Sequence, residues 1–169
     1  MDRRREMKKL PYGIFWLPPV SSTKNYNDPT QWAVWANPLS LHITGVVARC
    51  SWELIEPVEG TYNWEYIDSI KAAAHAGGFY WELAIMCNQG SNAAYPFYPS
   101  WVQGDGAALV TIHDNSGTAV TNLASWDPVF QAKWGAFLVA LAARYDDNDA
   151  WLSAVQMTGP GRQGELYDC

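Results

Sequence analysis

The sequence predicts an α/β fold with a parallel β-sheet, and three observations support this prediction. Short apolar runs alternate with segments of helical periodicity, which is the order expected of βα units. The run from His42 to Trp52 is almost continuously hydrophobic and rich in β-branched residues, as is typical of a parallel strand covered on both faces. Two adjacent glycines, Gly77 and Gly78, separate a predicted helix from the next apolar run.

The first half of the chain is predicted to contain three strands and an intervening helix. The apolar run from Tyr12 to Pro19 predicts the first strand, and one short helix is expected within 28–36, before the second strand at 42–52. Asn63 is a good N-cap for a helix that continues to the two glycines. The apolar run from Phe79 to Asn88 follows at once, so strand, helix and strand together predict a βαβ unit.

The second half is predicted to contain a β-hairpin, a helix and a fourth strand. Apolar and polar residues alternate on both sides of 114–117, which predicts a hairpin inserted before the next helix. Asp127 caps that helix, with Pro128 in its first position. The run from Trp151 to Thr158 predicts the fourth strand. The stripe that the helix buries is expected to comprise Phe130, Trp134, Phe137, Leu141 and Tyr145.

Four βα units are half of a (β/α)8 TIM barrel, which typically needs about 250 residues. A chain of 169 residues is too short to close such a barrel. It therefore forms either the N-terminal half of the barrel of a longer enzyme or a small open α/β domain. We expect the former, because the sequence stops just past a strand without a capping element. Residues 1–10 are expected to form a basic flexible tail, and residues 11–169 the partial barrel with strands 1–4 and the inserted hairpin.

Composition and charge argue against several classes of protein. The formal net charge is −6 and no basic face can be identified, whereas a nucleic-acid binder requires one. No apolar stretch is long enough to cross a bilayer. The basic start, MDRRREMKK, is followed by a run that three prolines interrupt and that lacks a small-residue cleavage site. A signal peptide is therefore not supported, and the protein is taken as cytoplasmic by default.

No metal site, cofactor or disulfide framework is predicted. Cys50, Cys87 and Cys169 are an odd number without paired spacing, and the three histidines show no ligand spacing. Ten tryptophans and nine tyrosines, by contrast, are more than packing usually requires. Most of these aromatic side chains are expected in the core. Two or three near strand ends are candidates for stacking on pyranose rings.

Polar and aromatic residues gather at the carboxyl ends of the predicted strands, where sites lie in barrels and in open parallel sheets. Arg49 and Trp52 follow the second strand, Asn88 follows the third and Glu165 follows the fourth. Because these ends meet at one edge of a parallel sheet, we expect the functional site there. Arg49, Trp52 and Asn88 are candidates for substrate binding.

The residues leave two interpretations of Arg49 open. Strand alternation places Arg49 on the same face as Val47, and it places Glu82 on the same face as Met86 in the next strand. In the first interpretation, Arg49 orients a catalytic carboxylate or a sugar hydroxyl through charge-assisted hydrogen bonds. In the second, it forms a buried ion pair with Glu82 or Glu53 that joins neighbouring strands.

The segment between the second strand and the following helix is predicted to be scaffolding. Glu53, Glu56 and Glu59 are expected to be solvated in or beside this loop. Tyr62 and Trp64 are expected to pack the helix onto the strand.

Glu165 is the carboxylate with the most suitable place for catalysis. A general acid for glycosidic bond cleavage needs a carboxyl group near the leaving oxygen, with its pKa raised by a partly apolar setting. Glu165 follows the fourth strand in a loop whose glycines allow close backbone approach. From the residues alone, an ordinary surface glutamate is the alternative, and it is the commoner case.

Four segments follow one another between Gly45 and Glu165: GVVARCSWELIEPVEGTYNWEYID, PSWV, WDPVFQAKWGAFLVALAARYDDND and VQMTGPGRQGE. In order and spacing they resemble the first half of clan A glycoside hydrolases, best the β-galactosidase-like family 42 and its relatives. That family carries an arginine at the end of the second strand and a W..lEP.eG.ynw..ID stretch into the following helix. It also has a Pro-x-Trp loop after the third strand.

The resemblance implies a retaining β-glycosidase barrel that acts on O-glycosidic bonds of a glycoside or oligosaccharide. Glu165 would match the acid/base of the fourth strand, Arg49 the arginine of the second strand, and Trp101 a wall of the sugar site. The clan usually has Asn immediately before its acid/base glutamate, whereas this chain has Gly164. The nucleophile would follow a seventh strand, so the isolated chain is expected to lack normal glycosidase activity.

Two other functions stay open beside the enzyme. One is a carbohydrate-binding barrel fragment whose aromatic loops hold a glycan without cleaving it, and calorimetry with oligosaccharides would separate it from the enzyme. The other is a structural half-barrel that pairs with a copy of itself or with another chain, because its last strand would otherwise be an open edge. Sedimentation would test this second alternative. Neither a nucleic-acid nor a membrane partner is expected.

Overall fold

The computed structural model of the chain describes residues 13–16, 43–87, 97–113, 117, 119–145 and 149–156. Its sheet has four parallel strands in the order β1-β2-β3-β6. They are β1 (Ile14–Trp16), β2 (Ile43–Ser51), β3 (Tyr80–Met86) and β6 (Leu152–Gln156). The antiparallel hairpin of β4 (Leu109–His113) and β5 (Ala119–Leu123) forms a second sheet. Both the parallel sheet and the inserted hairpin are as predicted.

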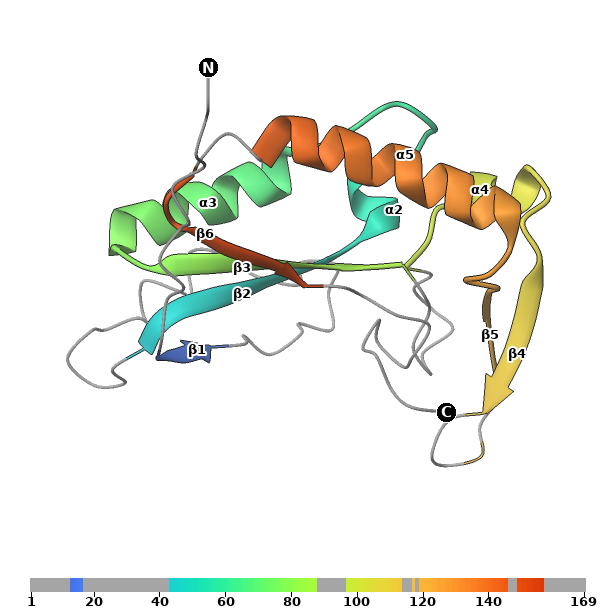
Figure 1. Cartoon of the computed structure of the whole chain (residues 1–169), viewed down its shortest axis with the longest axis horizontal. Coiled ribbons are helices and arrows are strands. Elements are labelled where there is room, and N and C mark those ends of the chain that lie inside the picture. The colour runs from blue at the N-terminus through green and yellow to red at the C-terminus, as the bar shows by residue number, and fades with distance from the viewer. Residues whose placement is uncertain are drawn as a thin grey trace, which may run out of the picture.

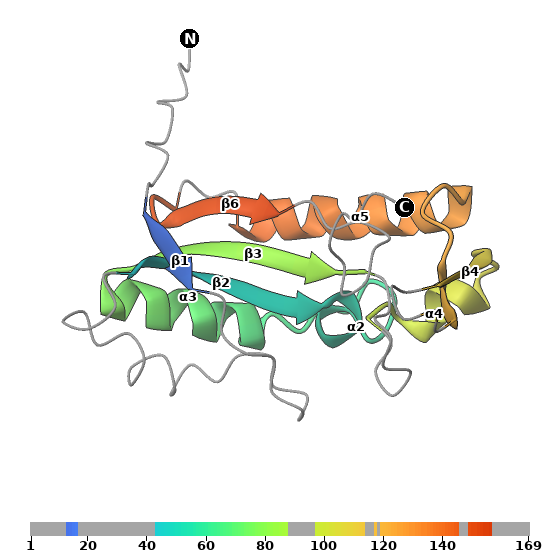
Figure 2. The ribbon, with the colours of Figure 1, turned by 90° about the horizontal axis from the view of Figure 1, so that it is seen from below.

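Helices cover one face of the parallel sheet. α3 (Glu65–Gly77) joins β2 to β3, α5 (Pro128–Tyr145) precedes β6, and both lie on the same side of the strands (Figure 1). Figure 2 shows the strands from the other side, in front of these helices. In a βα barrel the helices lie outside and the opposite face of the sheet lines the interior. The described residues therefore have the layer order of half a barrel.

α3 begins and ends close to where the sequence predicts. The N-cap residue is Trp64, one position after the predicted Asn63, and its side chain makes no capping bond; the Asn63 Oδ1 instead accepts a hydrogen bond from the Glu65 N–H at 3.2 Å. Gly78 has a φ of +70°, and its N–H donates to the carbonyl of His75 at 3.1 Å. This left-handed conformation ends the helix at a residue that has no Cβ to strain it. α3 buries Ile67, Ile70 and Ala74.

α5 is capped by Asp127, as predicted. Its Oδ1 accepts hydrogen bonds from the N–H groups of Val129 at 2.9 Å and Phe130 at 3.0 Å. The bond from Phe130 is the largest cause of the lowered pKa of Asp127. Trp134 in the predicted stripe is half-buried. The buried members of that stripe are Phe130, Phe137, Leu141 and Tyr145.

The core between the sheet and the helices is largely aromatic. Trp52 and Phe137 are both fully buried, and their ring centroids lie 5.6 Å apart. Tyr62 stacks on Trp64 at 5.0 Å, and Trp64 in turn stacks on Phe137 at 6.4 Å. Tyr62 and Trp64 therefore pack into the core, where α5 supplies a ring neighbour for both of them.

Two short helices lie beyond the carboxyl ends of β2 and β3, where the sequence predicts loops (Figure 1). α2 (Trp52–Ile55) starts directly after β2, and Ser51 caps it by accepting a hydrogen bond from the Leu54 N–H at 3.3 Å. α4 (Ser100–Gly104) follows Pro99. The predicted helix within 28–36 and the tail at 1–10 lie outside the described residues. Among the helices described, none has the length and hydrophobicity that crossing a membrane requires.

Candidate functional site

The two faces of β2 differ in what covers them. Ala48 and Cys50 belong to the buried core beneath the helices, and burial raises the pKa of the Cys50 thiol. Val47 and Arg49 alternate with them and therefore lie on the opposite face. In a barrel this second face lines the interior, so Arg49 stands at the carboxyl end of an inward-facing row.

Arg49 is 9% exposed and pairs in register with Ala84 of β3. Its backbone carbonyl accepts a long hydrogen bond of 3.4 Å from the Tyr66 hydroxyl. This contact attaches the first turn of α3 to the carboxyl end of β2. The position fits the predicted mouth of the barrel, and the role of Arg49 toward a sugar or a carboxylate stays a prediction.

Glu82 lies on the same inward face and pairs in register with Val47. Its carboxylate accepts hydrogen bonds from Ser153 Oγ at 3.2 Å and from Gln156 Nε2 at 3.0 Å. Glu82 therefore joins β3 to β6 within the sheet. Met86 alternates onto the same face, as the sequence predicts, and packs against Phe97.

Trp52 packs into the core on the helix-covered side. Trp52 shares strand parity with Ala48 and Cys50, so alternation places its side chain on their face, away from the face that bears Arg49. Trp52 is 0% exposed, and its ring neighbours are Trp101, Phe130, Trp134 and Phe137. Core packing is therefore what the described residues show for Trp52, and its contact with a substrate stays a prediction.

Glu56 is buried, so the prediction that it is solvated is wrong. Its side chain accepts hydrogen bonds from Trp52 Nε1 at 2.7 Å and from the Gly60 N–H at 2.8 Å, and only 3% of the residue is exposed. These donors replace the water that a buried carboxylate loses. Glu53 is partly exposed and Glu59 is exposed. The spacing of four between Trp52 and Glu56 is the signal that predicts their contact once α2 is recognised as helical.

Trp101 lies in α4 and is half-buried. Its Nε1 donates a hydrogen bond of 3.1 Å to the backbone carbonyl of Glu56. Its ring meets Trp52 edge to face at 5.8 Å, and the ammonium of Lys133 in α5 lies 5.6 Å from its centroid. Trp101 is therefore held between α2 and α5, and its predicted role as a wall of the sugar site stays a prediction.

Lys133 links three segments around Trp101. Its ammonium forms an ion pair with Asp105 at 2.8 Å and a second ion pair with Glu59. The hydrogen bonds to Asp105 and then to Glu59 raise the pKa of Lys133. The turn after α2, the end of α4 and the first half of α5 are thus joined at one side chain.

Asn88 and Glu165 lie outside the described residues, so their predicted roles remain predictions. Within the described part of the chain, no three His, Cys, Asp or Glu side chains cluster closely enough to hold a metal ion.

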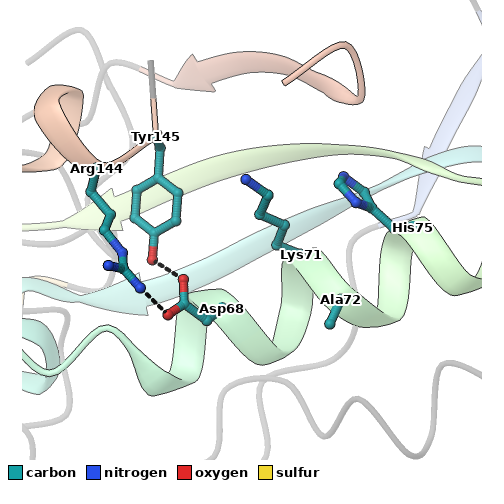
Figure 3. Close-up of a pocket in the computed structure, with 6 residues that line it drawn as sticks. All are labelled: Asp68, Lys71, Ala72, His75, Arg144 and Tyr145. Atoms are coloured by element: carbon teal, nitrogen blue, oxygen red, sulfur yellow. Dashed lines mark hydrogen bonds and ion pairs between the residues drawn. The ribbon is translucent and has the colours of Figure 1, made fainter. Parts of the chain in front are cut away.

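A pocket of about 430 Å³ lies between α3 and the end of α5 (Figure 3). Asp68 accepts hydrogen bonds from Arg144 at 2.6 Å and from the Tyr145 hydroxyl at 2.9 Å, while Lys71 lies 3.4 Å from Asp149. Burial, followed by the bond to Asp68, raises the pKa of Tyr145. The charged groups therefore cross-link the helix layer on the side of the sheet opposite Arg49. The lining residues are Asp68, Lys71, Ala72, His75, Arg144 and Tyr145.

Comparison with known proteins links this arrangement to glycoside hydrolases. The family model for glycoside hydrolase family 42, described as β-galactosidase, matches residues 39–158. This range contains β2, β3, the hairpin, α5 and β6. No curated protein sequence matches the chain.

Three solved structures share the fold at low sequence identity. The catalytic domain of the β-amylase from Paenibacillus polymyxa has a TM-score of 0.67 at 17% identity, covering 83% of this chain and 35% of that chain. The β-galactosidase from the psychrophilic Marinomonas ef1 has a TM-score of 0.58 at 17% identity, with coverages of 85% and 20%. The cold-adapted β-galactosidase from Rahnella sp. R3 has a TM-score of 0.58 at 18% identity, with coverages of 94% and 22%.

The chain spans between 20% and 35% of the length of these three structures. The prediction of a partial (β/α)8 barrel is thereby confirmed.

Proposed function

Because this chain belongs to glycoside hydrolase family 42, we propose that it supplies the first four βα units of a retaining β-glycosidase. The observation that carries the proposal is the family match over 39–158, a range in which β2 holds Arg49 at the carboxyl end of the inward face. The proposed substrate is a glycoside or oligosaccharide, for which the β-galactosidase name of the family favours a β-galactoside.

In this proposal Glu165 protonates the leaving glycosidic oxygen and then removes a proton from the water that completes hydrolysis. Arg49 orients either that carboxylate or a sugar hydroxyl, because a guanidinium donates several hydrogen bonds in a fixed planar arrangement. Asn88 and Trp101 are proposed to contact the sugar directly. Trp52 is proposed to support this site from the core, through its contact with Trp101.

Retaining hydrolysis needs a second carboxyl group about 5–5.5 Å from the first. The family resemblance assigns this nucleophile to the seventh strand of the barrel, beyond the four strands described. We therefore expect the isolated 169-residue chain to bind galactosides without turning them over at enzyme-like rates.

Calorimetry with lactose and maltotriose, combined with a turnover assay on an aryl β-galactoside, tests the function. The expected result is binding of lactose without normal turnover. Enzyme-like turnover by the isolated chain that Glu165→Gln abolishes would contradict the requirement for further strands and support the role of Glu165. Turnover that Glu165→Gln leaves unchanged would contradict that role. A chain that binds neither lactose nor maltotriose would count against a sugar site formed by these four strands.

A reading frame that continues past Cys169 allows a second test. If it encodes four further βα units and a glutamate after the seventh strand, the extended protein is expected to hydrolyse aryl β-galactosides. Loss of general acid–base catalysis in Glu165→Gln should then lower kcat by roughly 10²–10⁴-fold. An extended protein that binds lactose without hydrolysing it would favour the carbohydrate-binding alternative.

The sheet edge at β6 suggests where the rest of a barrel is added. Within the described residues β6 pairs with β3 on one side, and Val155 on β6 is 48% exposed. We propose that further strands, or those of a second copy, pair at this edge. Sedimentation velocity over a range of concentrations tests the second copy, and a monomer at every concentration would contradict it.

A further inference from the structure

We propose that Glu56 is a positioning residue that fixes Trp101, and with it α4, against α2 at the carboxyl end of β2. The inference rests on the proposed function, because these two segments border the sugar site only if the site lies at the carboxyl ends of the strands. It assigns no direct contact with substrate to Glu56.

The side chain of Glu56 is fixed by two donors. The indole of Trp52 and the amide of Gly60 donate to its two carboxylate oxygens at 2.7 and 2.8 Å. Burial and then the nearby charge of Glu56 raise the pKa of Tyr62. A carboxylate with charge-assisted bonds on both oxygens has one orientation available to it. The turn that follows α2 is therefore held in one conformation.

The backbone of Glu56 contacts α4 as well as α2. The Glu56 N–H donates to the carbonyl of Trp52 at 2.8 Å, which closes α2, and the Glu56 carbonyl accepts from Trp101 Nε1 at 3.1 Å. A second link runs from the Glu53 N–H to the carbonyl of Phe97 at 3.2 Å. α2 and its C-cap thus hold two points of the described segment 97–104, at Phe97 and at Trp101.

Packing alone does not account for a carboxylate at this position. A buried ionised group costs desolvation energy, and an apolar side chain of similar volume is often equally stabilising. What an apolar residue cannot do is accept the hydrogen bonds of Trp52 and Gly60. The carboxylate therefore orients the turn, and the turn directs the Glu56 carbonyl toward the indole of Trp101.

The test uses the 169-residue chain with four sequences: wild type, Glu56→Met, Glu56→Gln and Glu59→Gln. Glu56→Met keeps the volume and removes both acceptors, whereas Glu56→Gln retains one acceptor oxygen. Glu59→Gln is the matched control, since Glu59 is exposed in the same turn and Lys133 keeps its pair with Asp105. The readouts are the indole N–H signals of Trp52 and Trp101 in ¹⁵N spectra, the thermal midpoint and lactose affinity by calorimetry.

In Glu56→Met we expect the Trp101 indole signal to shift and its hydrogen exchange to accelerate. Lactose affinity should fall about tenfold, equivalent to about 1.4 kcal/mol. Glu56→Gln is expected to recover part of both effects, and Glu59→Gln to match the wild type. A purely structural role predicts a lower thermal midpoint with the Trp101 signal and the lactose affinity unchanged, and this result would overturn the proposal.

If Glu56→Met does not fold, Glu56→Gln is the deciding variant. A Trp101 signal and a lactose affinity equal to those of the wild type would then overturn the proposal. A shifted signal together with a weaker affinity would support it. A wild-type chain that binds no lactose counts against the sugar site. In that case the Trp101 signal alone judges Glu56, since a shift in Glu56→Met supports its positioning of Trp101 and an unchanged signal refutes it.

Discussion

The carboxylate of Asp149, which precedes β6, lies 3.1 Å from Nε2 of His75 on α3. The same carboxylate accepts hydrogen bonds from Trp81 Nε1 at 3.2 Å and from the Trp151 N–H at 2.9 Å, and Lys71 lies 3.4 Å away. Only 3% of its side chain is exposed. One buried acidic group therefore joins α3, β3 and the start of β6.

Asp149→Ala is expected to destabilise the fold by removing the acceptor shared by these groups. A hydrogen bond to a charged group contributes about 1.5–3 kcal/mol, and the partly exposed Lys71 and His75 add less, so we expect a loss of about 2–3 kcal/mol in the free energy of unfolding. Urea unfolding measures it. The exposed Glu65→Gln serves as control, with a change within about 0.5 kcal/mol. Equal urea midpoints for Asp149→Ala and the wild type would contradict this role.

The same group predicts how stability depends on pH. Burial acts to raise the pKa of Asp149, but the Trp151 N–H, His75, Trp81 and Lys71 outweigh burial and hold it below its usual value. Because the folded pKa is the lower one, Asp149 stabilises the fold above the unfolded value of about 3.9, and this contribution is lost as the pH falls through the folded pKa.

Urea unfolding of the wild type and Asp149→Asn from pH 7 down to about pH 3 tests this linkage. The difference in unfolding free energy between the two proteins should be constant near neutral pH and should narrow below about pH 4. A difference that stays the same across the whole range would show that the charge of Asp149 is unimportant.

Two positions on α5 should respond very differently to truncation. Phe137 is 0% exposed and packs against Trp52, Tyr62, Trp64 and Trp134, so Phe137→Ala is expected to lose about 3–5 kcal/mol of unfolding free energy. Val139 is 71% exposed on the same helix, and Val139→Ala should change the free energy of unfolding by less than about 0.5 kcal/mol. Chemical denaturation compares the pair, and similar losses for both would contradict this description of the core.

Gly78 and Gly104 both have open space around them, so replacing either by alanine tests backbone strain without a steric clash. A Cβ added to either Gly78 or Gly104 meets nothing within 4 Å, but only Gly78 of this pair has a positive φ, of +70°. Gly78→Ala should therefore cost about 1–2 kcal/mol, the penalty of a left-handed residue with a Cβ. Gly104→Ala should cost nothing and gain up to about 1 kcal/mol. The thermal midpoints of the two variants should move in opposite directions.

Periodicity predicts most of the described fold because each signal is local. Continuous hydrophobicity identifies β2, alternation on both sides of a turn identifies the β4–β5 hairpin, and Asp127 marks the start of α5. The paired glycines likewise end α3 where the sequence indicates. None of these signals depends on knowing which segments meet in space.

The environment of Glu56 could not be obtained in this way. Alternation and polarity assign a glutamate between a strand and a helix to solvent, whereas its burial depends on an indole one helical turn earlier and on the amide of Gly60. The side of the sheet on which Trp52 lies, by contrast, follows from strand alternation, because Trp52 shares parity with Ala48 and Cys50. The contact between Trp52 and Glu56 depends on the short helix α2, which is too brief to show a periodic pattern.

The pairing of β3 with β6 has a consequence for the order of folding. Trp81 pairs with Leu152 across the hairpin and α5, whereas the two strands of the hairpin meet across a short turn. Closing a long loop costs more chain entropy than closing a short one. The hairpin is therefore expected to form faster than the pairing of β3 with β6, which must close the longer loop. During synthesis β3 therefore leaves the ribosome well before β6 does, and one of its edges stays unpaired until the chain has been extended through α5.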